Sequence, residues 1–319
     1  MTEQASSIGI IGEPTFDERN ERIKWFLTTP ISSEQELEKE LRKFKELIKE
    51  EGVNRVTARV FLEKKLSESA QIKEYKEAEI TLNGKFNDFN LVYLGLNTKE
   101  RKESRYLREA EVHAAKMIDR EEKDTNYNES IERQIKKNIE IKVGNILDVD
   151  VTNILELYKE AYKERYTFGL NHENISSLLN NKNNIKAIAV DRDKVVSIGV
   201  AEVCNVKVGN ENFRFAELSD AATYNNYSKQ GLYGATSSAL MKELAEQEVD
   251  LVYGEARSAH IGVNIVCRRT GRRFSGLLQK HCKISGPKDF NEISDYENLN
   301  VWAIEKKSLK NLVEEYNGD

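Results

Sequence analysis

The sequence predicts an α/β (α+β) protein in two parts: a smaller α+β domain, then a larger domain with a mixed sheet flanked by helices. Segments with apolar residues at helical spacing alternate along the chain with short runs rich in Val, Ile, Leu, Tyr and Phe. From residue 139 the expected elements follow the order β-α-α-β-β-β-α-β-α-β-β, which is typical of a mixed sheet covered by helices. The 319 residues exceed the roughly 250–300 at which one core stops growing, so two domains are expected.

The first domain contains elements of both kinds. Leu37, Leu41 and Phe44 lie at i, i+4 and i+7, which is the apolar spacing of an amphipathic helix. Asn83 followed by Gly84 is a hairpin turn signal, because both residues tolerate positive φ. The expected elements are helices over 34–51 and 99–123, and strands over 55–63, 77–85 and 89–97.

A polar stretch of weak periodicity over residues 121–138 marks the domain boundary. The division expected is a domain over 1–125, a linker over 126–138, a second domain over 139–306 and a tail over 307–319. In the second domain, strands are expected over 139–146, 185–193, 194–209, 213–223, 251–258, 274–284 and 298–305. Helices are expected over 152–166, 173–180, 259–269 and from the glycine-containing loop to about residue 249.

Composition excludes several classes of function. The formal net charge is −5, and because nucleic-acid-binding domains are usually basic, no nucleic-acid partner is expected. No run reaches the ~20 apolar residues of a membrane span, and the N-terminus lacks the pattern of a signal peptide. The cysteines Cys204, Cys267 and Cys282 have no metal-ligand spacing and fit a reducing cytoplasm. We therefore expect a cytoplasmic protein without a metal or a membrane partner.

A loop with two glycines joins the strand expected at 213–223 to the following helix. Its glycines are Gly231 and Gly234, and Ser228, Lys229 and Gln230 could each donate a hydrogen bond to a phosphate. A helix N-terminus presents unpaired N–H groups and the positive end of a dipole, and glycine lets the backbone approach an anion closely. An ordinary tight turn would use the same residues, so both interpretations stay open from the loop alone.

The element order and this loop resemble the GNAT superfamily of acyl-CoA-dependent acyltransferases. That resemblance implies a centrally parallel mixed sheet, with the N-terminal domain as a degenerate copy of the same fold as one option. The family loop reads Arg/Gln-x-x-Gly-x-Gly/Ala and binds the pyrophosphate of coenzyme A; Gly231 matches its key glycine. Ser228 and Tyr233 depart from the pattern, and Gly234 lies one place late. The implied donor is acetyl-CoA, and the implied cofactor-binding residues here are Ala221, Ala222, Thr223, Ser228, Lys229, Gln230, Gly231, Leu232, Tyr233 and Gly234.

Three stretches look like the β-lysine N-acetyltransferase branch of that superfamily. They read AELSDAAT, YGEARSAHIGVNIVCRRTGRRFSG and LNVWAIE, starting at residues 216, 253 and 299. Glu217 resembles the catalytic glutamate of the histone-acetylating branch, on a strand that the family interrupts with a bulge. The alternative for Glu217 is a strand-edge residue in solvent or paired with an arginine. Asp220 is a second catalytic candidate that could hold the ammonium, or it is a β-bulge or turn residue that bonds to its own backbone.

The remaining residues implied by the resemblance are in the helix expected at 259–269 and in segments that would contact the amine substrate. Cys267 takes the position of a tyrosine acid, although a small buried core residue is the alternative. His260 and Asn264 take positions near the pantetheine arm, or they are cap and surface residues. Substrate-binding candidates are Tyr162, Arg165, Tyr166, Phe168 and Glu255, for which an ordinary helix or strand face is the alternative.

Together these observations predict an N-acetyltransferase that moves an acetyl group from acetyl-CoA to the primary amine of a small molecule. A basic or β-amino acid such as β-lysine is the expected acceptor. The alternatives are a GNAT-like binding or regulatory protein without turnover, and an acyl- or aminoacyltransferase with another donor. A homodimer is compatible with the sequence.

Overall fold

The computed structural model describes residues 11–18, 20–98, 101–102, 105–119, 126–146, 149–162, 166, 168–283 and 296–317. The C-terminal part follows the predicted element order. Its strands are β6 (Glu140–Gly144), β7 (Asn184–Asp191), β8 (Lys194–Val208), β9 (Glu211–Thr223), β10 (Leu251–Arg257), β11 (Arg273–Cys282) and β12 (Glu297–Glu305). Its helices are α4 (Tyr127–Ile135), α5 (Val151–Tyr162), α6 (His172–Asn180), α7 (Leu232–Glu246), α8 (Ile261–Arg269) and α9 (Lys306–Asn317). The order predicted for 139–305 is thus confirmed.

The N-terminal part holds the remaining elements. They are β1 (Pro14–Asp17), β2 (Arg22–Phe26), β3 (Arg55–Glu63), β4 (Lys76–Thr81) and β5 (Phe89–Asn97), with helices α1 (Glu34–Glu51), α2 (Ala70–Lys73) and α3 (Arg105–Asp119). Helix α1 has the predicted bounds because strong signals flank it. Ser33 and Glu36 form a capping box at its start, and Gly52 ends it with a φ of 65°.

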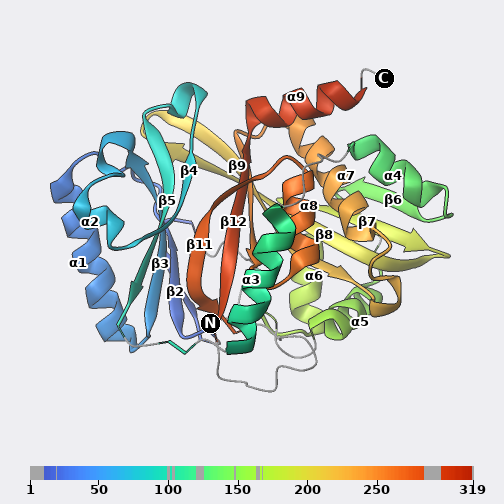
Figure 1. Ribbon diagram of the computed structural model, residues 1–319, viewed down its shortest axis with the longest axis horizontal. Coiled ribbons are helices and arrows are strands. Elements are labelled where there is room, and N and C mark those ends of the chain that lie inside the picture. Colours follow the sequence, from blue (N-terminus) through green and yellow to red (C-terminus); the bar gives the residue numbers. More distant parts are fainter. Residues whose placement is uncertain are drawn as a thin grey trace.

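Among the described residues, all twelve strands belong to one mixed sheet. The strand order is β1-β2-β3-β5-β4-β11-β12-β10-β9-β8-β7-β6. β4 and β11 join the two parts, with Ala78 opposite Gly276. A Cβ at Gly276 would lie 2.4 Å from the Ala78 Cα, so this close approach requires glycine. In Figure 1, β11 and β12 lie between strands β1 to β5 on one side and strands β6 to β10 on the other.

The sheet curves so strongly that its N-terminal strands face β9, although seven places separate β2 from β9 in the strand order. The rings of Phe26 and Phe215 stack with their centroids 5.0 Å apart. Phe61 packs edge-on against Phe213 at 5.2 Å. These aromatic side chains belong to one core between the two parts of the sheet, which fixes the N-terminal strands against β9.

Helices cover the other surfaces of the sheet. α7 packs on one face of β7, β8 and β9, where Ala201, Ala216 and Leu218 are buried. α5 and α6 pack on the opposite face, over Ile198 and Val200. α1 covers the outer face of the N-terminal strands, and α3 packs against α8. Figure 1 shows α3 crossing in front of β12 and α9 lying along one end of the sheet.

Five elements differ from the expected pattern. β1, β2 and α2 were not predicted, because their runs are short. Helix α4 lies inside the stretch expected as a linker, and α9 lies inside the expected tail. α4 packs on α7, next to the glycine loop. The division of the chain into two domains stays a prediction.

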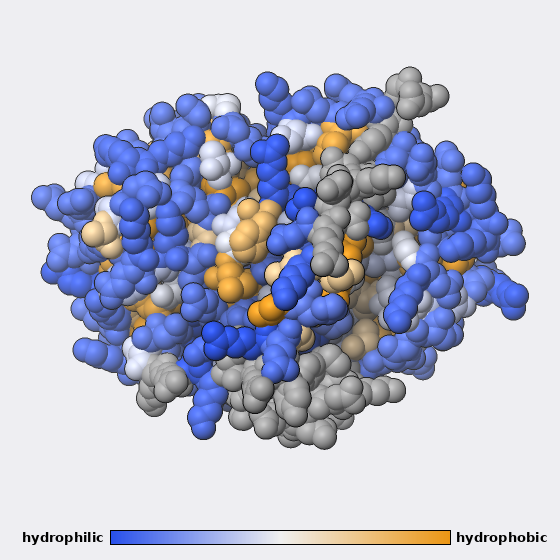
Figure 2. Space-filling view, viewed as in Figure 1, coloured by the Kyte–Doolittle hydropathy of each residue, from blue (hydrophilic) through white to orange (hydrophobic). Residues whose placement is uncertain are grey.

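The face shown in Figure 2 is largely hydrophilic, with apolar side chains gathered near its middle, over β11 and beside α3. A hollow there is lined by Val112 and Leu277 among mostly polar side chains. No helix in the described ranges is both long enough and apolar enough to cross a bilayer.

Candidate active site

β9 and β10 are parallel neighbours that pair over a short distance and then separate. Their register joins Phe215 to Leu251, Ala216 to Val252 and Glu217 to Tyr253, and no described pair continues it. Past Tyr253, β10 still pairs with β12, while β9 still pairs with β8. The carboxyl ends of parallel strands are where open α/β sheets bind ligands, so this separation places a candidate site beside Glu217.

A β-bulge interrupts β9 just after the separation begins. Ser219 pairs with Val200 and Ala222 pairs with Ile198, so Asp220 and Ala221 together lie opposite one residue of β8. Asp220 has a φ of 48°, in the left-handed region. A bulge leaves backbone groups outside the ladder, where they can contact a ligand. The resemblance implied a bulge in this strand, and the structure has one there.

Three tyrosines of the α5 region hold this bulge. Tyr158 donates to the Asp220 carbonyl, Tyr162 donates to the Ala221 carbonyl, and Tyr166 donates to Asp220 Oδ1. The rings of Tyr162 and Tyr166 lie 4.3 Å apart. Together the hydroxyls fix both backbone carbonyls of the bulge and one carboxylate oxygen.

The Asp220 carboxyl group is buried beside a second acid. Burial, followed by the nearby Glu202 carboxylate, raises the pKa of Asp220 to about 7. Ser219 Oγ donates to Asp220 Oδ2 at 3.0 Å. Asp220 lies in a β-bulge, as the alternative interpretation stated, but neither described bond of its carboxylate goes to its own backbone.

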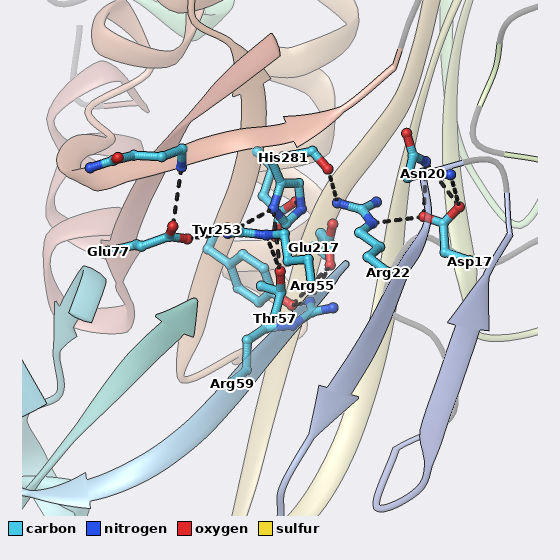
Figure 3. A network of polar contacts seen from close by, with 12 residues as sticks. Asp17, Asn20, Arg22, Arg55, Thr57, Arg59, Glu77, Glu217, Tyr253 and His281 are labelled. Carbon is cyan, nitrogen blue, oxygen red and sulfur yellow. Dashed lines mark hydrogen bonds and ion pairs between the residues drawn. The ribbon is translucent and has the colours of Figure 1, made fainter. Parts of the chain in front are cut away.

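Glu217 is buried, with 3% of its surface exposed, and it pairs with an arginine of the N-terminal part. Arg59 Nη1 donates to Glu217 Oε2 at 3.0 Å, and the Tyr253 hydroxyl donates to the same oxygen at 2.9 Å. Arg59 Nη1 also donates to the Tyr253 hydroxyl at 2.8 Å. Figure 3 shows this group with Arg59 reaching it from a different strand. The pairing with arginine was foreseen as an alternative for Glu217, but the burial was not.

Glu255 lies close to Glu217 from the next strand. Burial and the Glu217 charge raise the pKa of Glu255. His281 Nε2 lies 3.7 Å from Glu255 Oε2. Burial and the surrounding cations, first Arg22, lower the pKa of His281 well below its usual value, so this imidazole is neutral at pH 7. Two acids of the C-terminal part therefore meet one guanidinium and a neutral histidine.

The glycine loop differs in character from this buried group. Ser228, Lys229, Gln230 and Gly231 are all exposed. Lys229 and Gly231 have left-handed φ angles of 62° and 85°. Gly231 is the N-cap residue of α7, and it has no side chain that could occupy the N–H groups of the first turn. The loop thus presents the N-terminus of a 15-residue helix to solvent, which suits an anion such as a pyrophosphate.

Helix α4 lies against one side of this loop. Gln134 Nε2 and Lys137 Nζ both donate to the Gln230 carbonyl, at 3.1 and 3.3 Å. A Cβ at Gly231 would lie 3.3 Å from Gln134 Nε2, and a Cβ at Gly234 would lie 3.7 Å from Ser130 Oγ. Gly231 therefore lets the loop lie close to α4 and adopt its left-handed conformation, whereas a side chain at Gly234 would make only an ordinary contact. Leu232 is buried in the core, and Tyr233 is half-buried.

The predicted residues of α8 lie in different surroundings. Cys267 is buried, and burial raises the pKa of its thiol. Asn264 is fully buried and donates to the Arg257 and His260 carbonyls, while its Oδ1 accepts from Asn300 and Trp302. These four bonds use the whole hydrogen-bonding capacity of the amide. His260 is the exposed N-cap residue of α8.

The other predicted residues lie around the bulge. Ala222 is buried, and Thr223 Oγ1 lies 2.7 Å from Ser197 Oγ at the end of β9. Phe168 packs edge-on against Tyr166 at 4.9 Å. Arg165 lies outside the described residues. The roles assigned to all these residues stay predictions.

Sequence reasoning missed Arg59, Tyr93, Tyr158 and Tyr253. Tyr158 is four residues before Tyr162 and so shares its helix face, a signal that was available. Arg59 alternates with Arg55 and Thr57 along a strand that is otherwise apolar, which indicated polar contacts on one face. No sequence signal gives the partner of Arg59, since Glu217 lies 158 residues away.

Among the described side chains, no group of three or more His, Cys, Asp or Glu is arranged to hold a metal ion.

The comparisons with known proteins agree with this geometry. Residues 143–263 match the family model for the acetyltransferase (GNAT) domain. The chain is 27% identical over 154 residues to N-acetyltransferase YodP of Bacillus subtilis, covering 48% of this chain and 50% of that protein. It is 24% identical over 170 residues to the beta-lysine N(6)-acetyltransferase of Methanococcus maripaludis, covering 53% and 56%. The chain therefore spans about half the length of the curated relatives it matches.

Among solved structures, the ribosomal-protein-S18-alanine N-acetyltransferase of Escherichia coli aligns at 14% identity, over 52% of this chain and 93% of that one, with a TM-score of 0.40.

Proposed function

We propose that this chain, which carries an acetyltransferase (GNAT) domain over residues 143–263, transfers an acetyl group from acetyl-CoA to the primary amine of a small molecule. One observation carries the proposal. Along a single strand and the loop after it, a buried carboxylate (Glu217), a bulge (Asp220 and Ala221) and an exposed helix N-terminus (Gly231) follow one another beside the separation from β10. These are a base, a site for the thioester carbonyl and a site for the donor's phosphates.

The reaction we propose is direct transfer. The neutral amine nitrogen attacks the thioester carbonyl carbon, a C–N bond forms, and the C–S bond breaks to release the CoA thiolate. Glu217 takes the proton that the ammonium loses, since a carboxylate within reach of the amine can act as a general base. Backbone N–H groups at the bulge stabilise the developing oxyanion. The nitrogen, which is positively charged after the attack, loses one further proton to give the amide, and the departing thiolate takes up a proton to give the CoA thiol.

The finer part of the proposal concerns the acceptor. The acids Glu202, Glu217, Asp220 and Glu255 lie around the separation of β9 and β10, and carboxylates are suited to hold an ammonium group. The sequence resemblance and the 24% identity to a beta-lysine N(6)-acetyltransferase support a basic or β-amino acid such as β-lysine. We place Tyr162, Tyr166 and Phe168 along the acceptor.

Titration calorimetry with acetyl-CoA and with free CoA tests the donor part. We expect micromolar binding of both, and its loss in Gly231→Glu, which puts a side chain in a left-handed position and a negative charge beside the pyrophosphate. Gly209→Glu is the matched control, because Gly209 also has a left-handed φ, of 63°, but lies in the turn between β8 and β9. The control should lose stability and keep its affinity.

Turnover is tested with a panel of amines and detection of the released thiol. β-Lysine, lysine and cadaverine separate a requirement for an amino-acid carboxylate from a requirement for an amine alone. Binding of acetyl-CoA without turnover on any amine would contradict the enzyme and favour a binding or regulatory protein. Absence of binding to either nucleotide would overturn acetyl-CoA as the donor and favour a transferase with another donor.

A further inference from the structure

Arg59 connects the N-terminal part of the chain to the carboxylate proposed as the base. Its side chain is buried, with 3% exposed, and its guanidinium lies 5.5 Å from the Phe26 ring centroid and 5.9 Å from that of Tyr93. It donates to Glu217 and to the Tyr253 hydroxyl. The guanidinium is thus held by aromatic rings of β2 and β5 and by hydrogen bonds to side chains of β9 and β10.

The contacts of Glu217 fall on one of its two oxygens. Among the described residues, Arg59 and Tyr253 both bond to Oε2, and no bond is made to Oε1. A carboxylate held in this way stays oriented and keeps its second oxygen for another partner. A proton from a bound ammonium is such a partner.

Tyr93 adds an independent observation at the same place. Its hydroxyl is buried and makes no hydrogen bond of good geometry to a described residue, and its polar contact there is with the Glu255 side chain. The ring lies 6.5 Å from that of Tyr253, and the hydroxyl is close enough to Glu255 and Arg59 for their charges to affect its pKa. A buried polar group without a hydrogen bond of good geometry costs stability, and a bound molecule that supplies that bond would account for it.

We propose that the N-terminal part completes the acceptor site, with Arg59 holding the Glu217 carboxylate in place and Tyr93 contacting the bound amine. This inference rests on the proposed function and extends it to residues outside the matched domain. Arg59 is a positioning residue, because it acts through Glu217. Tyr93 is a contact of the acceptor, and its hydroxyl accepts from, or donates to, the ligand's polar groups.

The charges around Glu217 decide what removal of Arg59 would do. Titratable groups surround Glu217 from seven strands: Lys24, Arg59, Tyr93, Glu202, Cys204, Asp220, Tyr253, Glu255 and, beside Glu255, His281. Without Arg59, Glu217 and Glu255 would be neighbouring buried acids with much less compensation. Like charges in a buried site favour protonation of one member, so the pair would be fully ionised only at higher pH.

The experiment compares two buried arginines of β3. Arg59→Met is tested against Arg55→Met, because Arg55 is fully buried on the same strand face and pairs with Glu77 instead of Glu217. For Arg59→Met we expect a loss of at least about 100-fold in kcat/KM for the amine, and an acid limb of the pH profile moved up by about one unit or more. The Kd for acetyl-CoA should stay within about threefold. Arg59→Lys should return the acid limb most of the way toward the wild-type position.

Arg55→Met should lose stability while its acid limb stays in place. If the two Met variants lose activity alike and neither moves the acid limb, the role of Arg59 is structural and the inference is overturned. Should Arg59→Met fail to fold, Arg59→Lys decides in its place: a wild-type pH profile with unchanged kcat/KM contradicts positioning by the guanidinium.

Tyr93→Phe tests the contact with little disturbance of the fold, because the hydroxyl it removes makes no hydrogen bond of good geometry and only a side-chain contact with Glu255. We expect unchanged or higher stability and a KM for the amine that rises about three- to tenfold. An unchanged KM would overturn the contact. Inactivity of the wild-type protein would instead contradict the proposed function, so the two failures are distinguishable.

Discussion

The glycine loop, residues 228–234, which we propose binds the donor, and the group around Glu217 lie on the same strand–loop–helix unit but are built in opposite ways. Residues 228–231 are contiguous and exposed, and they offer mainly backbone groups at a helix N-terminus. Glu217 is buried, and its partners Arg59 and Tyr253 come from other strands. The first region is a continuous stretch of sequence that a motif can describe. The second is formed by residues from distant strands, which the curvature of the sheet brings together.

This difference explains which changes each region tolerates. Backbone amides bind an anion whatever the side chains are, so Ser228 and Tyr233 can depart from the family pattern without removing the site. A buried ion pair has no such freedom, because loss of one partner leaves the other charge uncompensated. Substitutions in the loop should therefore affect mainly donor affinity, and substitutions near Glu217 mainly turnover and its pH dependence.

Glu217→Gln gives the largest expected effect and the sharpest test of this division. The amide keeps the shape of the side chain but cannot accept the ammonium proton, so kcat should fall by about 10²- to 10⁴-fold. The Kd for acetyl-CoA, measured by titration calorimetry, should stay the same because the glycine loop is unchanged. A fully active variant would show that another group is the base. A variant that also lost donor binding would break the separation of the two regions.

Asp220→Asn tests the buried charge at the bulge. The folded pKa of Asp220, about 7, lies above its ordinary value of 3.8, so the folded state binds this proton more tightly than the unfolded state. Its contribution to stability is therefore complete below about pH 4 and is lost as pH rises toward and through 7. The asparagine cannot ionise and lacks this loss.

The measurement is urea unfolding of both proteins from pH 4 to pH 8. The free energy of unfolding of Asp220→Asn, relative to wild type, should increase by up to about 1.4 kcal/mol per pH unit across that window. A constant difference would mean that Asp220 stays ionised in the folded protein. The exposed pair of Arg42 and Glu38 offers a control, since Glu38→Gln should leave the pH dependence close to wild type.

Much of the fold could be predicted from local sequence signals. The capping box of Ser33 and Glu36 and the C-cap Gly52 define α1, and the elements from 139 to 305 appear in the expected order. Elements with weak patterns were missed. α4 is polar and short, so composition alone made it part of a linker, and only packing against α7 explains its helix.

The candidate site divides in the same way. Gly231 and the bulge were predicted from a local pattern and a resemblance, and Tyr162 and Tyr166 were placed near the acceptor because the resemblance implies that this segment covers the amine site. Arg59 could not be found, since the sheet must curve through six strand positions before β3 meets β9. Long-range polar contacts of this kind give only a weak sequence signal. Here that signal is the alternation of polar residues within a buried strand.

Cys267→Ala has the smallest expected effect. It tests whether the donor side of the site depends on backbone groups alone or also on a side chain of α8. The thiol is buried in a small apolar cluster with Ala114, Ala256 and Trp302, and burial raises its pKa. A neutral thiol with a raised pKa is a poor source of a proton for the departing thiolate, so kcat should change by less than about threefold. The loss of one buried sulfur should lower the free energy of unfolding by about 1 kcal/mol.

Cys282→Ala is the matched control, because Cys282 is a buried cysteine in a different core cluster and burial raises its pKa to about 12. Both variants should then lose similar stability and keep their turnover. If Cys267→Ala alone lost more than about tenfold in kcat with an unchanged Kd for acetyl-CoA, the thiol would be the acid. Side chains would then matter on the donor side as well, and the contrast between a backbone-built donor region and a side-chain-built acceptor region would hold only for the phosphates.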